Sequence, residues 1–459
     1  MQFLNTEKFS FHQKGFSLNA DVSIFWPPML NLSIYHSSNH DCDGKIIAIS
    51  KGGIEVEAQK KILTFSYFLS FIALGLVSGA FGPSIPSFAE NTASAFNEIS
   101  SLFVFSSFGY IAGSFLAGFL YNRVPGNQIL VVVLILMAIG MGLLPVIQNL
   151  WLLVGLIFLI GIMQSSIDVG ENTLMVWLHG NKVAPFMNGL HFSFGIGSFT
   201  APLIIAQSLK GTQAINWAYW IIAILILIPV PFLFRLKSPV NPELRAQTSE
   251  ESNRLKSPIG LIALLILYFV FFSGAEITFA NWIYTHGLKS GFVDVESAAY
   301  LTSAFWGAFM VGRFLGIGLS RRFSSHQIIW FDLIGGYLTL LVMLIFSNSA
   351  WVLWVCTTAL GFFVATGFPT GMNLAGELNA VTARITSLIF VAASISVMIS
   401  PWIVGQLIDG ANNQVLIWVV MINLILAGVA MLGIHFWKKP AFQAAPQPSE
   451  ILPRSTSTD

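Results

Sequence analysis

The chain has 459 residues, of which 55% are hydrophobic and only 9% are charged, whereas a soluble domain carries about 25% charged residues. This balance excludes a soluble globular protein and predicts several membrane-spanning segments. The net charge of +1 gives no basis for nucleic-acid binding, and the two cysteines, Cys42 and Cys356, cannot build a disulfide framework.

Residues 1–60 lack an unbroken apolar stretch behind a basic start, so they do not match a signal peptide. The apolar run Phe25–Leu30 is too short to span a membrane and is interrupted by two prolines. We expect residues 1–60 to form a disordered cytoplasmic extension.

From Ile62 onward, apolar segments recur at about the 20-residue length that crosses a bilayer core of roughly 30 Å. Twelve transmembrane helices are predicted, near residues 62–89, 98–121, 128–147, 150–178, 184–208, 213–235, 258–286, 296–319, 327–346, 351–377, 385–408 and 414–437.

Basic residues fall in alternate connections between these segments, and only Lys210 and Lys289 lie on the other side. Because short basic loops stay in the cytoplasm, both termini are predicted to be cytoplasmic. The polar connection 237–257 indicates a linker between two six-helix halves, 61–236 and 258–438, with a disordered cytoplasmic tail at 439–459.

The two halves look related. A shift of 198 positions superimposes Gly109 on Gly307 and Arg123 on Arg321, and a shift of 199 brings Pro202 onto Pro401. Such repeats are typical of transporters with two bundles and a substrate site between them at the bilayer midplane. The predicted fold is an all-α membrane protein with twelve helices in two pseudo-symmetric bundles.

The fourth segment contains the polar run Ser165–Asn172. Asp168, Glu171 and Asn172 follow helical spacing and are expected to share one face. A carboxylate in the bilayer costs at least roughly 2.5–3.5 kcal/mol, so it normally faces a cavity or a partner. We expect this face to line a polar pathway; the alternative is that the acids pair with a basic group for purely structural reasons.

Further polar and aromatic candidates lie in other segments. Asn188 and His191 share a helical face and suit sugar hydroxyls, although a buried histidine bonded to a carbonyl is the plainer interpretation. Trp282 and Trp306 could lie against the apolar face of a pyranose ring, although most tryptophans here mark helix ends. Asn373, one turn after Pro369, is a further cavity amide, and Pro369 provides a place to bend.

The connection after the second segment resembles the signature of the major facilitator superfamily, in the stretch Gly118–Gly126. Arg123 is retained, but Asn122 replaces the usual acid, which puts in doubt a charge contact that helps hold one conformation. The resemblance extends over residues 60–440. It implies alternating access, with Arg123, Arg321, Arg313 and Pro369 as conformational gating residues.

Within that superfamily, the chain is similar to the fucose, galactose and glucose symporters and to the animal sodium-dependent glucose transporters. The matching stretches are Phe81–Pro86, Gly109–Ser114, Asp168–Asn172, Leu190–Gly195 with Ala201–Pro202, Ser273–Glu276 with Asn281–Trp282, and Phe368–Thr370. The resemblance places Asp168 and Asn172 at a cation-coupled sugar site, with Asn281 among the substrate-binding residues. It also implies an acid in the first segment, which this chain lacks.

Glu276 is a candidate for the missing second acid. An equally supported interpretation is a structural pair between Glu276 and Arg313, because buried charges are usually paired; Arg313 could instead snorkel to the surface. Asp168, Glu171 and Glu276 are therefore the predicted cation-coupling residues. Burial favours a neutral carboxylic acid that could carry a proton, and carboxylate oxygens also suit sodium. The sequence therefore leaves open whether the coupling ion is H+ or Na+.

No phosphate-binding loop, metal-ligand spacing or nucleophile elbow occurs in the sequence. The chain is therefore predicted to be no enzyme, to hold no metal or cofactor apart from a coupling H+ or Na+, and to use a gradient. We expect a monomeric symporter for a monosaccharide in a bacterial inner membrane or a eukaryotic plasma membrane. The alternatives are an exporter or exchanger of another small solute, a non-transporting sugar receptor, or a membrane enzyme.

Overall fold

The computed structural model describes residues 44–239, 258–378, 380, 383–410 and 414–437. A boundary between two compact units falls between Glu55 and Val56, and every predicted span lies after it. Twelve helices in the described ranges are long and apolar enough to cross a membrane, which confirms the predicted fold class. The tail at 439–459 and the first 43 residues of the expected extension lie outside the described residues.

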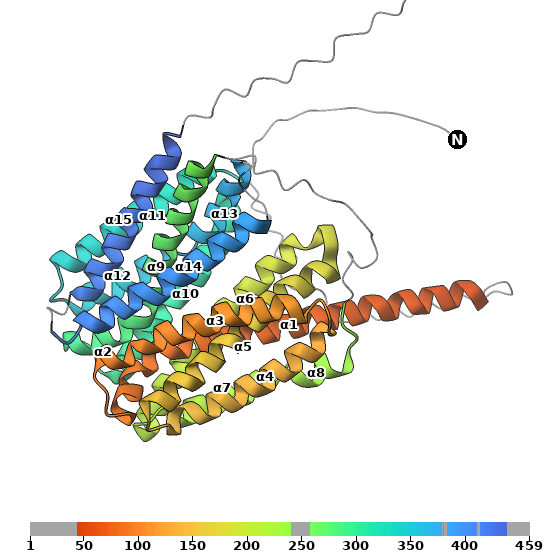
Figure 1. The fold of residues 1–459 in the computed structure, drawn as a ribbon, viewed down its shortest axis with the longest axis horizontal. Coiled ribbons are helices and arrows are strands. Elements are labelled where there is room, and N and C mark those ends of the chain that lie inside the picture. The colour runs from red at the N-terminus through yellow and green to blue at the C-terminus, as the bar shows by residue number, and fades with distance from the viewer. Residues whose placement is uncertain (1–43, 240–257, 379, 381–382, 411–413, 438–459) are drawn as a thin grey trace, which may run out of the picture. The chain divides into compact units, whose positions relative to one another are not determined.

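The first half contains six spans, and its helices run from red through yellow to yellow-green in Figure 1. Its helices are α1 (Gly44–Asn91), α2 (Phe96–Ile99), α3 (Ser101–Leu120), α4 (Gly126–Leu143), α5 (Leu150–His179), α6 (Ala184–Thr212), α7 (Asn216–Ile226) and α8 (Val230–Arg235). The second half contains α9 (Ile259–Ser290), α10 (Val295–Leu319), α11 (Ser325–Ile345), α12 (Ala350–Phe363), α13 (Gly367–Glu377), α14 (Ala383–Leu407) and α15 (Val415–His435).

Two spans are interrupted where proline removes a backbone donor. The sixth span divides into α7 and α8 at Pro229, and the tenth divides into α12 and α13 over residues 364–366. Pro369 has no N–H to donate to the carbonyl of Ala365, four residues earlier. The tenth segment, predicted as one helix over 351–377, is therefore a discontinuous helix with a break just before Gly367.

Glycines set the closest helix contacts inside each half. Gly109 of α3 faces the backbone of Phe158 on α5, and Gly161 of α5 faces the backbone of Ser106. The second half repeats this arrangement, because Gly361 of α12 meets the backbone of Phe305 on α10. Small residues permit such close approach in membranes, where packing drives helix association.

A similar contact joins α1 and α6. Gly75 lies against the backbone of Phe194, and the Ser198 hydroxyl donates to the Gly75 carbonyl at 3.3 Å.

Glycines also pack across the two halves. Gly82 of α1 lies against the backbone of Asn281 on α9, whereas Gly307 and Gly405 of the second half lie against side chains of the first. Of the glycine contacts between the halves in the described residues, the one at Gly82 brings backbone against backbone.

Polar contacts between the halves gather at the end of the bundles opposite residues 236 and 258. On one side, Lys210 at the end of α6 pairs with Glu296 at the start of α10, with 3.0 Å between Nζ and Oε1. Beside this ion pair, the Gln207 amide donates to the Tyr300 hydroxyl at 2.7 Å. We call these four residues the α6–α10 clasp.

A second set of contacts joins α2 and the residue after it, Ser100, to the end of α14. The Gln406 amide donates to the Asn97 carbonyl at 2.7 Å and to the Ser100 hydroxyl at 3.0 Å. The Phe96 N–H donates to Asp409, which also pairs with Lys289 of its own half at 2.8 Å. Both sets hold the halves together at the same end, so the conformation is closed there.

Lys210→Ala should increase the population that is open at the clasp end. The shift should be small, because an ion pair between exposed side chains is weakened by solvent and salt. Pulsed electron resonance distances between spin labels on Thr212 and Phe292 would measure the shift. Lys182→Ala is the control, because Lys182 is exposed and forms no ion pair in the described part of the chain; an equal shift in both variants would contradict a role for the clasp.

Candidate functional site

Asp168 lies on α5 and is half-buried. Its carboxylate accepts hydrogen bonds from the Tyr110 hydroxyl on α3 and from the Asn172 amide, the latter at 2.9 Å. The same amide also donates to the Asp168 backbone carbonyl at 2.8 Å. Two donors stabilise a negative charge without neutralising it, so the group keeps both its acceptor character and some accessibility.

Close helix packing explains why Tyr110 reaches Asp168. Gly113, one turn after Tyr110, lets α3 approach the backbone of Ile162 on α5. One turn before Asp168, the Gln164 amide donates to the Ser78 hydroxyl on α1 at 3.2 Å. Three helices therefore contribute to one polar wall, which consists of Ser78, Tyr110, Gln164, Asp168 and Asn172.

Glu171 is in a different environment from Asp168, despite the helical spacing that groups them. Its side chain is completely buried, and neither carboxylate oxygen has a hydrogen-bond partner among the described residues. The Ser70 hydroxyl lies next to Glu171, but its hydrogen bond goes to the Ser66 carbonyl of its own helix, at 2.9 Å. Tyr67 and Tyr121 also lie within electrostatic reach of Glu171, which places it inside the first bundle.

Glu171→Met should stabilise the folded protein by about 1–3 kcal/mol, because it removes a buried polar group that has no hydrogen-bond partner. Thermal unfolding of the purified protein in detergent would measure the effect. Gln164→Met is the matched control on the same helix, since it breaks the bond to Ser78 and should lower stability. A decrease in stability for Glu171→Met would mean that a bound cation or proton network holds this carboxyl group.

In the second half, Arg313 of α10 connects several predicted site residues. It interacts electrostatically with Glu276 of α9 and with His191 of α6. Arg313 and Glu276 do not form a close ion pair in the described part of the chain. The guanidinium instead lies 4.5 Å from the Phe309 ring centre, and its Nε donates to the Ala365 carbonyl at 3.3 Å.

The predicted tryptophans lie in packed surroundings. Trp282 is fully buried, donates from its indole nitrogen to the Pro401 carbonyl at 2.9 Å, and packs against Phe96 and Phe103. Trp306 is 4% exposed and packs edge-on to Phe194. In this conformation, neither indole offers an open face to a sugar ring.

The predicted amides Asn188 and Asn281 and the predicted imidazole of His191 differ in accessibility. Asn188 is exposed on α6, whereas His191 is half-buried and lies edge-on to Phe71 with 5.7 Å between ring centres. Asn281 is half-buried and donates to the Ile277 carbonyl of its own helix at 2.9 Å. Of these three residues, His191 lies within electrostatic reach of Arg313.

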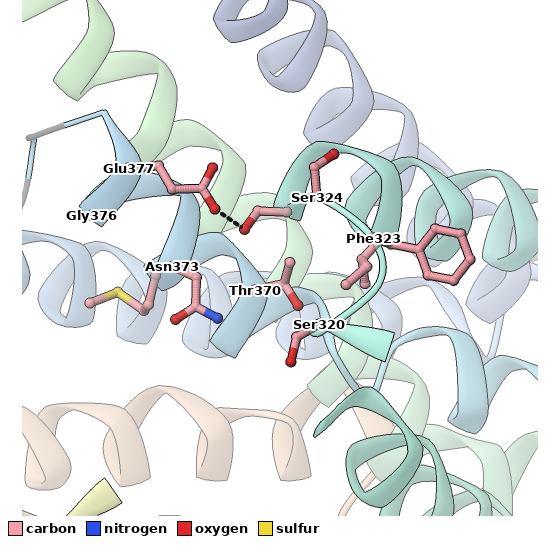
Figure 2. Close-up of a pocket in the computed structure, with 10 residues that line it drawn as sticks. Ser320, Phe323, Ser324, Thr370, Asn373, Gly376 and Glu377 are labelled. Carbon is pink, nitrogen blue, oxygen red and sulfur yellow. Dashed lines mark hydrogen bonds between the residues drawn. The ribbon is translucent and has the colours of Figure 1, made fainter. Parts of the chain in front are cut away.

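Asn373 lines a cavity of about 560 Å³ between α13 and the turn that joins α10 to α11 (Figure 2). Ser320, Phe323 and Ser324 form the wall on the side of the turn. The polar wall around Asp168 contributes no residue to this cavity.

The predicted gating residues lie at the end of the bundles that carries residues 236 and 258. Arg123 is exposed and stacks over the Phe119 ring at 4.0 Å, and Arg321 is exposed after α10. Pro369 lies in the first turn of α13. Arg313 takes the carbonyl that Pro369 leaves without a donor, so these two gating candidates meet at the break.

Several polar residues were missed by sequence reasoning. Tyr110 and Gln164 belong to the polar wall, and a buried carboxylate, Asp332, lies on α11. Asp332 stands in an apolar span just as Asp168 does, so the cost of a charge in the bilayer was a signal that could have identified it. The described residues contain no group of three or more His, Cys, Asp or Glu side chains placed to hold a metal ion.

Comparison with known proteins places this arrangement in a family. The family model "Major Facilitator Superfamily" matches residues 63–401. Sodium-dependent glucose transporter 1 of Danio rerio is 29% identical over 78% of this chain and 66% of its own length, which is just under two thirds. Sodium-dependent glucose transporter 1A of Mus musculus is 27% identical over 74% of this chain and 88% of its own length.

More distant similarities agree on the fold. Major facilitator superfamily domain-containing protein 4A of Danio rerio is 23% identical over 76% of this chain and 83% of its own length. The crystal structure of a mutant of the nucleoside transporter NupG superimposes with a TM-score of 0.64 at 15% identity, covering 82% of this chain and 98% of that chain. The chain is an integral, multi-pass membrane protein and belongs to the Major Facilitator Superfamily.

Proposed function

We propose that this protein is a secondary active transporter that couples the movement of a monosaccharide to a cation gradient by alternating access. The observation that carries the proposal is the polar wall around Asp168, in a span that otherwise consists mostly of apolar residues. Similarity to proteins named sodium-dependent glucose transporters supports a sugar as the solute. Carboxylate, amide and hydroxyl groups in one wall match the alternating donors and acceptors of a sugar.

Asp168 is the proposed coupling residue. A proton bound to its carboxyl group would turn an acceptor into a donor, whereas a sodium ion would take its oxygens as ligands. Either ion competes with the Tyr110 hydroxyl and the Asn172 amide for the same oxygens. Cation binding would therefore release these two polar groups toward the sugar. Occupancy of the cation site would in this way affect occupancy of the sugar site.

His191, Glu276 and Arg313 are the proposed opposite wall, contributed by α6, α9 and α10. The remaining predicted residues have secondary roles in this proposal, because the tryptophans are packed and Asn281 bonds to its own helix. Glu171 is placed outside the sugar site, since it is enclosed in the first bundle.

The excess of basic residues supports a cytoplasmic position for the end that carries residues 236 and 258. With the clasp on the opposite side, the described conformation would then be open toward the cytoplasm. We propose uptake as the direction of transport, in a plasma membrane or a bacterial inner membrane.

Uptake of labelled D-glucose into proteoliposomes tests this function. Proton and sodium gradients are imposed separately, with and without a membrane potential, and accumulation above equilibrium is measured. Accumulation under one gradient supports symport and identifies the ion. Exchange without accumulation would indicate an exchanger, binding without entry would indicate a receptor, and chemical change of the sugar would indicate an enzyme.

A further inference from the structure

The break in the tenth span is held by polar groups from three different helices. The Arg313 guanidinium of α10 donates to the Ala365 carbonyl at 3.3 Å, and the Tyr268 hydroxyl of α9 donates to the Gly367 carbonyl at 3.0 Å. Between them, the Thr366 hydroxyl donates to the Asp332 carboxylate of α11 at 2.5 Å. Three consecutive residues are thus each bonded to a different neighbouring helix.

Asp332 is 4% exposed, and the described residues supply no Lys, Arg or His that forms an ion pair with it. A carboxylate in the bilayer is costly and is usually kept for a specific contact. Here the specific contact is the Thr366 hydroxyl, which belongs to the break itself.

The other end of α13 has a second bond of the same chemistry. The Ser325 hydroxyl, at the start of α11, donates to the Glu377 carboxylate at the last residue of α13 at 2.6 Å, as the dashed line in Figure 2 marks. Two hydroxyl–carboxylate bonds therefore tie both ends of α13 to α11. The donor is on the α13 side in one bond and on α11 in the other.

Space is available beside α13. The cavity of about 560 Å³ lies between α13 and the turn before α11, and it is lined by Thr370, Asn373 and Gly376 (Figure 2). One face of α13 packs against α9, where Gly367 meets the ring of Phe272 and Gly371 meets the ring of Tyr268. The cavity leaves space on another side of the helix, and the break at its start gives a point about which it can tilt.

We infer that α13 is a movable segment at the end of the bundle that carries residues 236 and 258, and that Asp332 is the positioning residue that holds it through Thr366. This inference deepens the proposed transport function and rests on it for its role in the cycle. Arg313 provides the connection, because it contacts the Ala365 carbonyl and also interacts with Glu276 and His191 of the proposed sugar site. A solute that attracts Arg313 would loosen one of the three ties at the break.

Thr366→Val tests this inference, because it removes the hydroxyl and keeps the size of the side chain. A cysteine replaces Gly376, which has open space around it, in a background without Cys42, and its modification by a thiol reagent is timed without sugar. We expect the rate of cysteine modification to change at least about tenfold. The loss of a hydrogen bond to a charged acceptor changes the equilibrium between the positions of α13 by roughly that factor. Thr366→Ser should restore the parental rate.

Thr339→Val is the matched control. Thr339 and Thr366 are both 8% exposed, but the Thr339 hydroxyl donates only to the Gly335 carbonyl of its own helix, at 2.7 Å. Equal rates in the two valine variants would overturn the inference. If Thr366→Val fails to fold, Ser325→Ala tests the second tie, and an unchanged cysteine rate would then count against a movable α13.

Transport provides an independent readout in the same variants. The exchange rate of D-glucose should change in Thr366→Val with little change in the concentration for half-maximal rate, because α13 moves after the sugar binds. The sugar-free cysteine rate does not depend on the substrate, so a failure of glucose transport would leave that result interpretable. A changed cysteine rate without glucose transport would therefore contradict the proposed function and support the movable segment.

Discussion

Asp168→Asn should abolish gradient-driven accumulation while it leaves sugar exchange measurable. The amide keeps the shape of the carboxyl group and one acceptor oxygen, but it can neither bind a proton at neutral pH nor attract sodium as a charge does. We expect the initial gradient-driven uptake rate to fall at least about tenfold, with a smaller effect on exchange between equal sugar concentrations. Both rates are measured in proteoliposomes under the gradient that drives the parent protein.

Glu171→Gln is the control for this variant, since it makes the same chemical change one helical turn away. Glu171 is enclosed and does not contact the polar wall through a hydrogen bond, so its variant should retain accumulation. Undiminished accumulation in Asp168→Asn would show that the assignment is wrong. Loss of accumulation only in Glu171→Gln would transfer the coupling role to the buried acid.

Gly75→Val should prevent the first bundle from packing. A side chain at this position would meet the backbone of Phe194 and Ser198 on α6, and backbone cannot move aside as a flexible side chain can. Overpacking in a core costs about 1–3 kcal/mol and occasionally more, and here it also breaks the bond from Ser198 to the Gly75 carbonyl. We expect a large loss of monodisperse protein in size-exclusion chromatography and a lower unfolding temperature.

Gly155→Val is the matched control in α5. Gly155 is exposed and has no neighbouring atoms where a Cβ would be placed. It should therefore yield protein with an unfolding temperature close to that of the parent. If Gly75→Val were equally well tolerated, the close contact between α1 and α6 would not be a determinant of folding.

The sequence predicts the spans well, because the bilayer imposes a length and an apolar composition that are visible without tertiary information. It also makes Asp168 a candidate site residue, since a carboxylate in such a span is costly. The boundary at Val364–Thr366 was not predicted, although Pro369 marks it. Proline in a membrane helix gives a kink or a break according to which neighbouring groups take the free carbonyl, and here that group is Arg313.

Helical spacing alone does not show whether two neighbouring acids have the same role. Asp168 and Glu171 are three residues apart, which predicts one face. A face of a helix inside a bundle nevertheless contacts more than one neighbour, so Asp168 meets Tyr110 while Glu171 is enclosed near Tyr67 and Tyr121. Tyr110 lies in the matching stretch Gly109–Ser114, but the sequence gives it no role, because its contact with Asp168 depends on the crossing of α3 and α5.

The contact of Gly82 with Asn281 has a mechanical consequence for transport. Gly82 lies roughly 14 Å along α1 from Asn91, at the clasp end, and roughly 37 Å from Glu57. If the halves rotate about this contact, the two lever arms differ more than twofold in length. A rotation just sufficient to separate the side chains of the clasp would therefore displace the opposite ends of the helices by a much larger distance.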